Sequence, residues 1–370
     1  MRGTVLGLPA VGLAVLMAAG CGGTVPPSDQ DRLTVKIGAI ISQTGVYAML
    51  GDDMETAMRL YLDDHGGRLG GRPAELLLAD DAGNPERATQ AVRRLIDEED
   101  VDVITGLIAS PVAVAVAEQA GRTPVVVANA GSDELRGPNL YRVSYTNHEH
   151  GRAAGRYAAQ RYGRQGVVLM ASDYSAGIET LAGFTDGYGA EPLKRILTPH
   201  GAVTDLKPYF AQIPPEAELL YAFYAGGEAV EFARAFKLLG HDRKIELLTC
   251  MNLTDEDVLQ AIGTDAEGIT SVGMYSPALD NPANAAFVAR WRARTGRNPS
   301  AVALQSWDAI RLIDLALSRG GDLTRRLGEL GELAGPRGPF RLDGEHNPVQ
   351  SWYVREYHNG VNRVIATIPP

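Results

Sequence analysis

From Leu33 onward the sequence alternates short apolar runs with longer amphipathic segments. Residues 33–42 (LTVKIGAIIS) predict a buried strand, because β-branched and aliphatic residues dominate the run. Residues 49–65 then bring Leu50, Met54 and Met58 to one helical face. Apolar strands separated by amphipathic helices of this length predict parallel sheets that are covered by helices on both faces.

The same alternation continues to the C-terminus and predicts more strands than one sheet would comfortably hold, so we expect two α/β sheets. The glycine-rich stretch 66–71 predicts a tight turn, and Asn359-Gly360 predicts the turn of a C-terminal hairpin. The predicted strands are 33–42, 74–80, 101–108, 124–129, 166–172, 219–224, 245–249, 269–275, 340–342, 350–356 and 361–368. The predicted helices are 49–65, 84–99, 111–120, 149–162, 176–187, 228–239, 282–294, 301–319 and 323–333.

Composition excludes several classes of protein. The 370 residues are 45% hydrophobic, which is too apolar for a disordered chain and enough for two cores. The formal net charge of −10 argues against a nucleic-acid partner, because phosphate neutralisation needs a basic face. Two cysteines exclude a disulfide scaffold and a multi-cysteine metal site.

The first residues have the pattern of a secretory signal. Arg2 precedes the apolar run 5–19, which is too short to span a membrane comfortably. The following Ala18-Ala19-Gly20-Cys21 resembles the lipobox of bacterial lipoproteins, with Ala18 where leucine is usual. The resemblance implies a signal peptide over 1–20 and lipidation of Cys21; ordinary secretion with an incidental cysteine is the alternative.

Residues 21–32 are polar and contain two prolines, so they predict a flexible tether. If Cys21 carries lipid, Cys250 has no disulfide partner. We expect a protein that is exported across the cytoplasmic membrane and held to its outer face by an N-terminal lipid.

Enzyme motifs are absent from the sequence. It contains no G-x-S-x-G elbow, H-E-x-x-H motif, P-loop or G-x-G-x-x-G motif. His148 and His150 are two residues apart and would point to different faces of a helix, whereas Thr146 to Glu149 reads as a capping box. We therefore expect no metal, no cofactor and no enzymatic activity. The adjacent carboxylates 52–53 and 80–81 are expected to face water or cap helices.

The loops after the strands are the places to look for a ligand, because open parallel sheets bind ligands beyond the carboxyl ends of their strands. Ser110 before Pro111 predicts a helix N-cap, whose free amides suit a carboxylate; a cap without a ligand is the alternative. Tyr47, Tyr174 and Tyr224 follow or end other strands. Each of these tyrosines either lines a common cleft or packs beside it.

Over about residues 33–366, the chain resembles the branched-chain amino-acid-binding (Leu/Ile/Val-type) periplasmic binding proteins of ABC importers. The resemblance is carried, in order and spacing, by VKIGAIIS, LLLADDAGNPERATQAVRRLI, VDVITGLIASPVAVAVAEQA with PVVVANA, and SWDAIRLIDLAL. It implies a two-lobed type I fold with a mostly parallel sheet in each lobe. Residues 33–145 and 275–336 would form lobe 1, and residues 146–274 and 337–370 would form lobe 2. Three crossovers near 144–147, 272–276 and 336–339 would join the lobes.

The resemblance also implies the function. The lobes would close on a small carboxylate or amino acid, and the protein, as a monomer, would deliver it to ABC permease subunits; a ligand sensor of the same fold is the alternative. The implied ligand-binding residues are Tyr47, Ala109, Ser110, Ala128, Asn129, Ala130, Tyr174, Tyr224 and Met251.

One departure from the family bears on the ligand. Amino-acid binders usually hold the ammonium group with a hydroxyl at the position of Ala130 and an acid near Met251 or Asn252. A desolvated ammonium without an anionic partner is costly. The segments LTDEDVLQAIG and YSPALDNPAN also resemble the branch of the family associated with aromatic carboxylates. An aromatic acid and a branched-chain amino acid are thus the two ligand classes in question.

Overall fold

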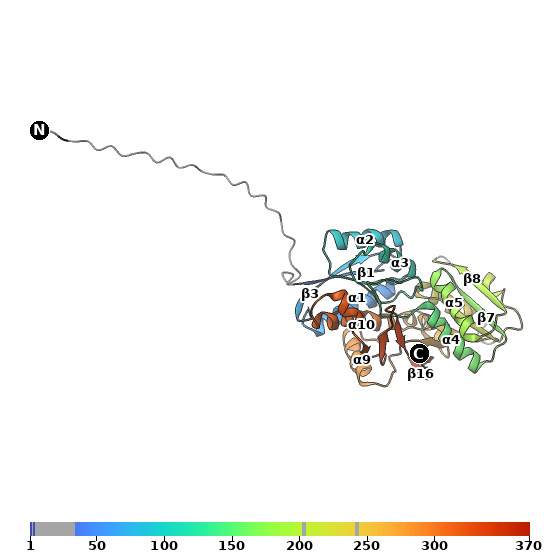
Figure 1. The fold of residues 1–370 in the computed structure, drawn as a ribbon. Coiled ribbons are helices and arrows are strands. Elements are labelled where there is room, and N and C mark those ends of the chain that lie inside the picture. The colour runs from blue at the N-terminus through green and yellow to red at the C-terminus, as the bar shows by residue number, and fades with distance from the viewer. Residues whose placement is uncertain (2, 4–33, 202–204, 241–243) are drawn as a thin grey trace. The chain divides into compact units, whose positions relative to one another are not determined.

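The computed structural model describes residues 1, 3, 34–201, 205–240 and 244–370. The predicted signal peptide, Cys21 and the tether lie outside these residues. Thr34–Pro370 forms one compact unit (Figure 1). Within the described residues, no helix is both long and apolar enough to cross a bilayer.

The first sheet has six strands in the order β2-β3-β1-β4-β5-β6. All neighbours are parallel except β2 and β3, which form a short hairpin. Its central strands are buried aliphatic runs, as expected of a parallel sheet covered on both faces. The strands are β1 (Val35–Ile41), β2 (Arg68–Leu69), β3 (Arg72–Asp80), β4 (Val103–Gly106), β5 (Val125–Val127) and β6 (Leu140–Arg142).

The second sheet has seven strands in the order β16-β15-β11-β10-β9-β7-β8. Five strands are parallel, and β15 and β16 add an antiparallel hairpin at one edge. The strands are β7 (Val167–Asp173), β8 (Lys194–Pro199), β9 (Leu219–Phe223), β10 (Glu246–Cys250), β11 (Thr270–Gly273), β15 (Trp352–His358) and β16 (Val361–Ile368). The two-sheet prediction is confirmed.

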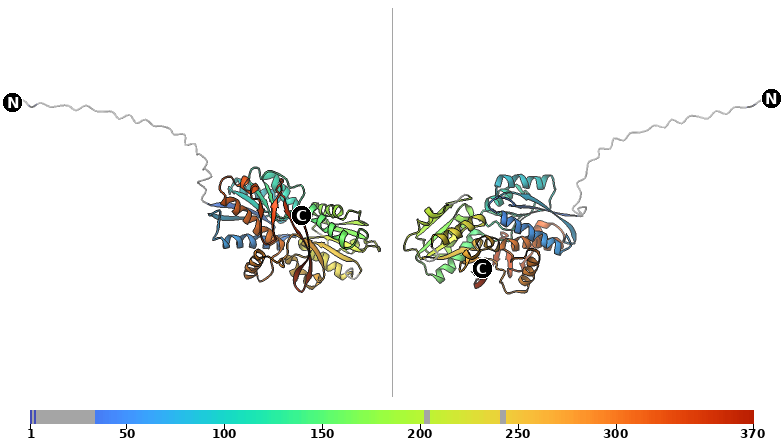
Figure 2. Two further views of the ribbon diagram at one scale, coloured as in Figure 1. Left: turned by 60° about the horizontal axis from the view of Figure 1, so that its bottom comes forward. Right: turned by 180° about the vertical axis from the view of Figure 1, so that it is seen from behind.

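Helices cover these sheets, and α1 and α10 lie side by side (Figure 2). A small antiparallel sheet precedes the final hairpin; it consists of β12 (Glu332–Leu333), β13 (Phe340–Leu342) and β14 (Pro348–Gln350). The helices are α1 (Ala48–Asp64), α2 (Pro85–Asp97), α3 (Ser110–Gln119), α4 (Asn147–Arg161), α5 (Ser175–Tyr188), α6 (Lys207–Phe210), α7 (Gly226–Leu238), α8 (Glu256–Ile262), α9 (Pro282–Thr295), α10 (Ala301–Ser318) and α11 (Leu323–Gly328), with 3₁₀ turns η2 (Met251–Leu253) and η3 (Gly263–Ala266).

Two hydrophobic cores accompany the two sheets. The first core gathers the side chains around β1, β4 and β5, and the second gathers those around β7, β9 and β10. Phe340 packs in the first core, whereas the sequence analysis assigns residues 337–370 to lobe 2. Trp352 packs in the second core. The exact lobe boundaries remain a prediction.

Local differences from the predicted elements have local causes. The predicted helix 323–333 ends at Gly328, and β12 follows Gly331, whose φ is +73°. β8 was not predicted, because its polar edge-strand sequence KRILTP has only two buried residues. The C-terminal hairpin turns at Asn359-Gly360 as predicted, and both residues have positive φ.

Candidate functional site

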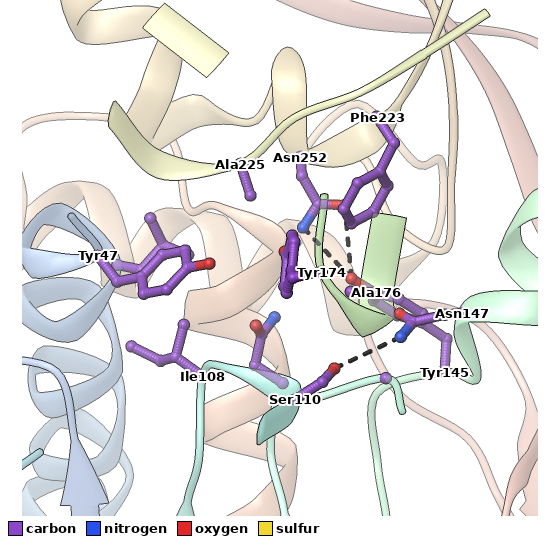
Figure 3. A pocket seen from close by; sticks show the side chains of 13 residues that line it. Tyr47, Ile108, Ser110, Tyr145, Asn147, Tyr174, Ala176, Phe223, Ala225 and Asn252 are labelled. Atoms are coloured by element: carbon purple, nitrogen blue, oxygen red, sulfur yellow. Dashed lines mark hydrogen bonds between the residues drawn. The ribbon is translucent and has the colours of Figure 1, made fainter. Parts of the chain in front are cut away.

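A pocket lies where the loops after β1, β4 and β5 face the loops after β7, β9 and β10 (Figure 3). The space between its walls is about 330 Å³, which includes some of the open solvent. Strand-end loops of both sheets supply nearly all of its wall, as expected for parallel sheets. The lining residues are Tyr47, Leu50, Ile108, Ser110, Asn129, Gly131, Tyr145, Asn147, Tyr174, Ala176, Phe223, Ala225 and Asn252.

The start of α3 forms one part of the wall. Leu107, at the end of β4, has a φ of +67°, which is unusual for a branched residue and turns the chain sharply towards the pocket. Ser110 is the first residue of α3, and Ala109 occupies the N-cap without a side-chain bond. The predicted role of Ser110 as N-cap is therefore wrong. Its hydroxyl instead lies 3.4 Å from the amide of Asn147, which donates to it.

The loop before α1 positions Tyr47. Asp80 accepts hydrogen bonds from the backbone of Gln43 and the hydroxyl of Thr44, and Asp81 accepts one from Ser42. Although burial would raise the pKa of Asp80, these bonds lower it. The prediction that this carboxylate pair faces water or caps a helix is therefore wrong, because Asp80 and Asp81 hold the loop before α1.

The Tyr47 side chain is buried, and among the described residues no group makes a well-formed hydrogen bond to its hydroxyl, although the Tyr174 side chain is close enough to affect its pKa. Burial raises the pKa of Tyr47, so the phenol is neutral and retains its proton to donate. Figure 3 shows this hydroxyl pointing into the pocket. A buried donor without a partner costs free energy, and a bound acceptor would recover it.

Loops from the first and second sheets meet at the start of α7. Gly226 has a φ of +56°, and a Cβ there would lie 2.7 Å from the carbonyl oxygen of Val46. The backbone N–H of Gly227 donates to the same oxygen at 3.2 Å. Only glycine fits this close approach, which brings the Tyr47 loop against the β9–α7 loop.

Aromatic side chains form the wall on the side of the second sheet. Tyr174 stacks on His200, with ring centroids 4.1 Å apart, and Phe223 lies 6.3 Å from Tyr174. Behind them, Glu228 accepts hydrogen bonds from Ser172 and from the backbone of Gly201. This wall therefore presents aromatic surface to the pocket, while its nearest carboxylate is occupied elsewhere.

Amides and hydroxyls supply the remaining polar groups of the pocket. Asn147 donates to Glu179 at 2.7 Å as well as to Ser110. The Tyr145 hydroxyl lies 3.3 and 3.4 Å from the two amide atoms of Asn252. Asn129 donates to Gln305 at 2.7 Å.

Charge is absent from this lining. None of the described residues that line the pocket is Asp, Glu, Lys, Arg or His. The positive ends of helix dipoles take the place of cations, because α3 and α5 both begin at the pocket and neither has a side-chain cap. Side-chain caps are present at α2, α9 and α10, which begin elsewhere, and also at α4, which begins at the pocket, whereas α6 and α8 begin elsewhere without one.

Four of the nine predicted binding residues line the pocket: Tyr47, Ser110, Asn129 and Tyr174. The other five do not, although a chain neighbour of each does. They are Ala109, Ala128, Ala130, Tyr224 and Met251.

Side chains of extended chain alternate in direction, which explains why Asn129 lines the pocket between two residues that do not. A ligand-binding role for the five residues stays a prediction. The amides of Ala128 and Ala130 bond to the β4 end, so between them only Asn129 lines the pocket. Tyr224 turns into the second core, where its hydroxyl pairs with Thr198. Met251 packs against Gly273.

Sequence reasoning also missed some lining residues, among them Tyr145, Asn147 and Phe223. Asn147 opens α4 directly after the capping residue Thr146, which accepts from the backbone of Glu149. The sequence thus predicted the capping box but not that Asn147, which lies within it, lines the pocket. For Asn252, the family resemblance suggested only a position where other members have an acid.

The two histidines near the site do not pair on a metal. His150 is buried, and its Nε2 lies 2.7 Å from the carbonyl oxygen of Val272, whereas His148 contacts Asp186 near the surface. Burial lowers the pKa of His150 to about 4, so the ring is neutral. Among the described residues, no group of three His, Cys, Asp or Glu side chains is arranged for a metal ion.

Comparisons with known proteins agree with this architecture. A solute-binding protein of an ABC transporter from R. palustris, solved in complex with benzoate, is 33% identical, with a TM-score of 0.85 and coverage of 91% of this chain and 97% of that one. A solute-binding protein from Rhodopseudomonas palustris BisB5, solved with 3,4-dihydroxybenzoic acid, is 28% identical with the same TM-score and coverage. Leu/Ile/Val-binding protein homolog 6 of Brucella melitensis is 28% identical over 343 residues, 87% of each chain.

The periplasmic binding protein family matches residues 34–361, nearly the whole described body. The two helix-flanked sheets and the pocket between their strand ends are the architecture of the type I members. The chain therefore belongs to this family, in its branched-chain amino-acid-binding group, and is a solute-binding protein of the ABC transporter type and not an enzyme.

Proposed function

We propose that this protein captures an aromatic monocarboxylate of the benzoate class and delivers it to an ABC permease. The observation that carries the proposal is the uncharged lining of a pocket that has uncapped helix starts in its wall. Closure of two lobes around the ligand is the mechanism that the fold supports.

Three neutral groups support a carboxylate ligand. The first-turn amides of α3 and the hydroxyl of Ser110 offer donors beside the positive end of the helix dipole. The unpartnered hydroxyl of Tyr47 adds a further donor. Fixed donors at such a site replace the hydrogen bonds that water makes to the free anion, so no cationic side chain is required.

The same lining disfavours an amino acid. An ammonium group would lie near the positive ends of helices and would find no carboxylate among the described lining residues. The aromatic surfaces of Tyr174 and Phe223 instead suit a flat ring. The complexes of similar proteins with benzoate and 3,4-dihydroxybenzoic acid support the same ligand class.

The proposal includes a lipid anchor at Cys21. It is supported by the lipobox-like sequence at residues 18–21 and by the polar stretch that follows it. In cells, Cys21→Ala should release the protein from the membrane fraction without changing its ligand affinity. A wild-type protein without a lipid-sized mass increase at its N-terminus would overturn the anchor alone.

Isothermal titration with benzoate, hydroxybenzoates, leucine, isoleucine and phenylalanine tests the ligand class. We expect benzoate-class acids to bind and the amino acids to fail. At 100 times Kd, a ligand should stabilise the protein by about 2.7 kcal/mol, which a thermal shift also detects. Tight binding of leucine, with no binding of aromatic acids, would overturn the proposal.

A matched variant makes this test sharper. Asn252→Asp keeps the shape of the side chain but puts a carboxylate in the pocket wall. It should weaken benzoate binding, because a second buried carboxylate in a pocket whose lining holds no cation repels the charge of the ligand. Unchanged benzoate affinity would show that position 252 does not face the ligand.

A further inference from the structure

Tyr145 and Asn252 form a polar pair in the pocket wall whose hydrogen bonds are incomplete. Both side chains are buried, with exposed fractions of 3% and 8%. The Tyr145 hydroxyl is the hydrogen-bond partner found for either amide atom of Asn252, at 3.4 Å from Oδ1 and 3.3 Å from Nδ2. One hydroxyl at these long distances cannot satisfy an amide that has two donors and two acceptor lone pairs.

Packing holds the Tyr145 ring, and a hydrogen bond anchors the turn that carries Asn252. The Tyr145 ring packs edge-on against His150 at 4.9 Å and Trp352 at 6.0 Å. Asn252 lies in the 3₁₀ turn η2, where Arg355 donates to the carbonyl oxygen of Met251 at 3.1 Å. The packing thus holds the polar pair facing the pocket (Figure 3).

The pair presents a donor and an acceptor without charge. A hydroxyl group of a ligand both donates and accepts, so it complements such a pair. A carboxylate only accepts and an ammonium group only donates, so each would use half of the pair. Asn252 also comes from the second sheet, whereas Ser110, the proposed carboxylate site, comes from the first. A ligand that bonds to Ser110 through its carboxylate and also contacts the second sheet would therefore meet Asn252 with another of its groups.

Resting on the proposed function, we propose that Tyr145 and Asn252 select aromatic acids that carry a ring hydroxyl, such as 4-hydroxybenzoate, over benzoate itself. Benzoate would close the pocket on an amide that is cut off from water and incompletely hydrogen-bonded. Sites built to bond a ligand hydroxyl reject analogues that lack it for this reason.

Isothermal titration of the purified full-length protein with 4-hydroxybenzoate, benzoate and 4-methylbenzoate tests the inference. The wild-type protein should bind 4-hydroxybenzoate at least about tenfold more tightly than either analogue. Because 4-methylbenzoate has nearly the same size, this comparison separates hydrogen bonding from filling of space.

Two variants assign the preference to the pair. Asn252→Leu should weaken 4-hydroxybenzoate and leave benzoate equal or tighter, so that the affinity ratio falls to about one. Tyr145→Phe removes one hydroxyl and keeps the ring packing, so it should reduce the ratio by a smaller factor. The affinity ratio is the readout because a purely structural defect would weaken the binding of all three ligands alike. If Asn252→Leu does not fold, Tyr145→Phe still tests the inference.

The outcomes separate this inference from the proposed function. Equal wild-type affinity for benzoate and 4-hydroxybenzoate overturns the inference and leaves the proposed function intact. A wild-type preference that persists unchanged in both variants also overturns it. Failure of every aromatic acid to bind overturns the proposed function, and the inference with it.

Discussion

The pocket and the buried ion pair around Arg337 are both polar regions enclosed by protein, but they use their hydrogen-bonding groups differently. In the pocket, the hydroxyl of Tyr47 is unpartnered and no lining side chain is charged. Arg337 is 2% exposed, yet its guanidinium group bonds to Asp308, the carbonyl oxygen of Val143 and Gln350. The difference teaches that buried polar groups which pair with one another support the fold, whereas the Tyr47 hydroxyl, which faces the pocket, keeps its hydrogen-bonding capacity for a ligand.

The largest effect should come from breaking the ion pair. Arg337→Met leaves the buried Asp308 with only Arg311, at 3.6 Å, as a cationic partner and should lower the free energy of unfolding by about 3 kcal/mol. Because Arg337 does not line the pocket, ligand affinity of the folded protein should change little. Chemical denaturation together with titration of a ligand measures both quantities.

A double variant controls for packing. Arg337→Met with Asp308→Leu removes both charges and should recover much of the lost stability, because an apolar pair of similar volume is tolerated where a single buried charge is not. Arg337→Met alone being as stable as the wild type would contradict the structural role of the pair.

The next effect is a dependence of stability on pH. Burial lowers the pKa of His150 to about 4 in the folded protein, against about 6.5 when unfolded. The unfolded chain therefore binds the proton first as pH falls, so stability is full above about pH 6.5 and is lost towards pH 4. The loss that is due to His150 should reach about 3 kcal/mol.

The variant His150→Phe keeps a ring stacked on Trp352 but cannot titrate. As pH falls from 6.5 to 4, the wild type should therefore lose more unfolding free energy than the variant. Taking this difference cancels the titration of carboxyl groups common to both proteins. A difference independent of pH would mean that the imidazole is not held neutral.

Within the pocket, Ser110→Ala should act on the ligand and spare the fold. The Ser110 hydroxyl does not cap α3, and its described hydrogen bond is a long one from Asn147. Loss of a hydrogen bond to a carboxylate costs about 1.5–3 kcal/mol, so the affinity for a bound acid should fall at least about tenfold. A drop in Tm of the ligand-free protein without a drop in affinity would assign Ser110 to the fold instead.

The smallest effect should have opposite signs for stability and binding. Tyr47→Phe removes a buried hydroxyl that lacks a partner, so the ligand-free protein should gain up to about 1 kcal/mol of stability. The affinity for the ligand should fall by a few fold. Thermal unfolding with and without ligand checks both signs, and a loss of stability would mean that water or protein already satisfies this hydroxyl.

Much of the fold was predictable because the hydrophobic periodicity and composition of a segment largely determine its secondary structure. The buried run of β1 and the Asn359-Gly360 turn are readable from neighbouring residues alone. The end of α11 at Gly328 and the edge strand β8 were not predicted, because Gly331 adopts a positive φ after the helix and β8 has only two buried residues. The loop placement of the site followed from the rule for strand ends, and Ser110 and Tyr174 line the pocket accordingly.

Single side-chain directions were the limit of sequence reasoning. Between Phe223 and Ala225, the tyrosine turns into the core, although a tyrosine at a strand end looks like a cleft residue. Asn252 lines the pocket, and Met251 beside it does not. A shift of one residue reverses the side-chain direction in extended chain, and no local pattern fixes that shift.

Helix α10 links the two halves of the molecule in one rigid element. Its Ala303 and Leu304 belong to the second core, and its Ala309 and Ile310 belong to the first. If either core unfolds, part of this helix loses the side chains that pack against it. We therefore expect one cooperative heat-absorption peak, with equal calorimetric and van't Hoff enthalpies, in place of two separate transitions.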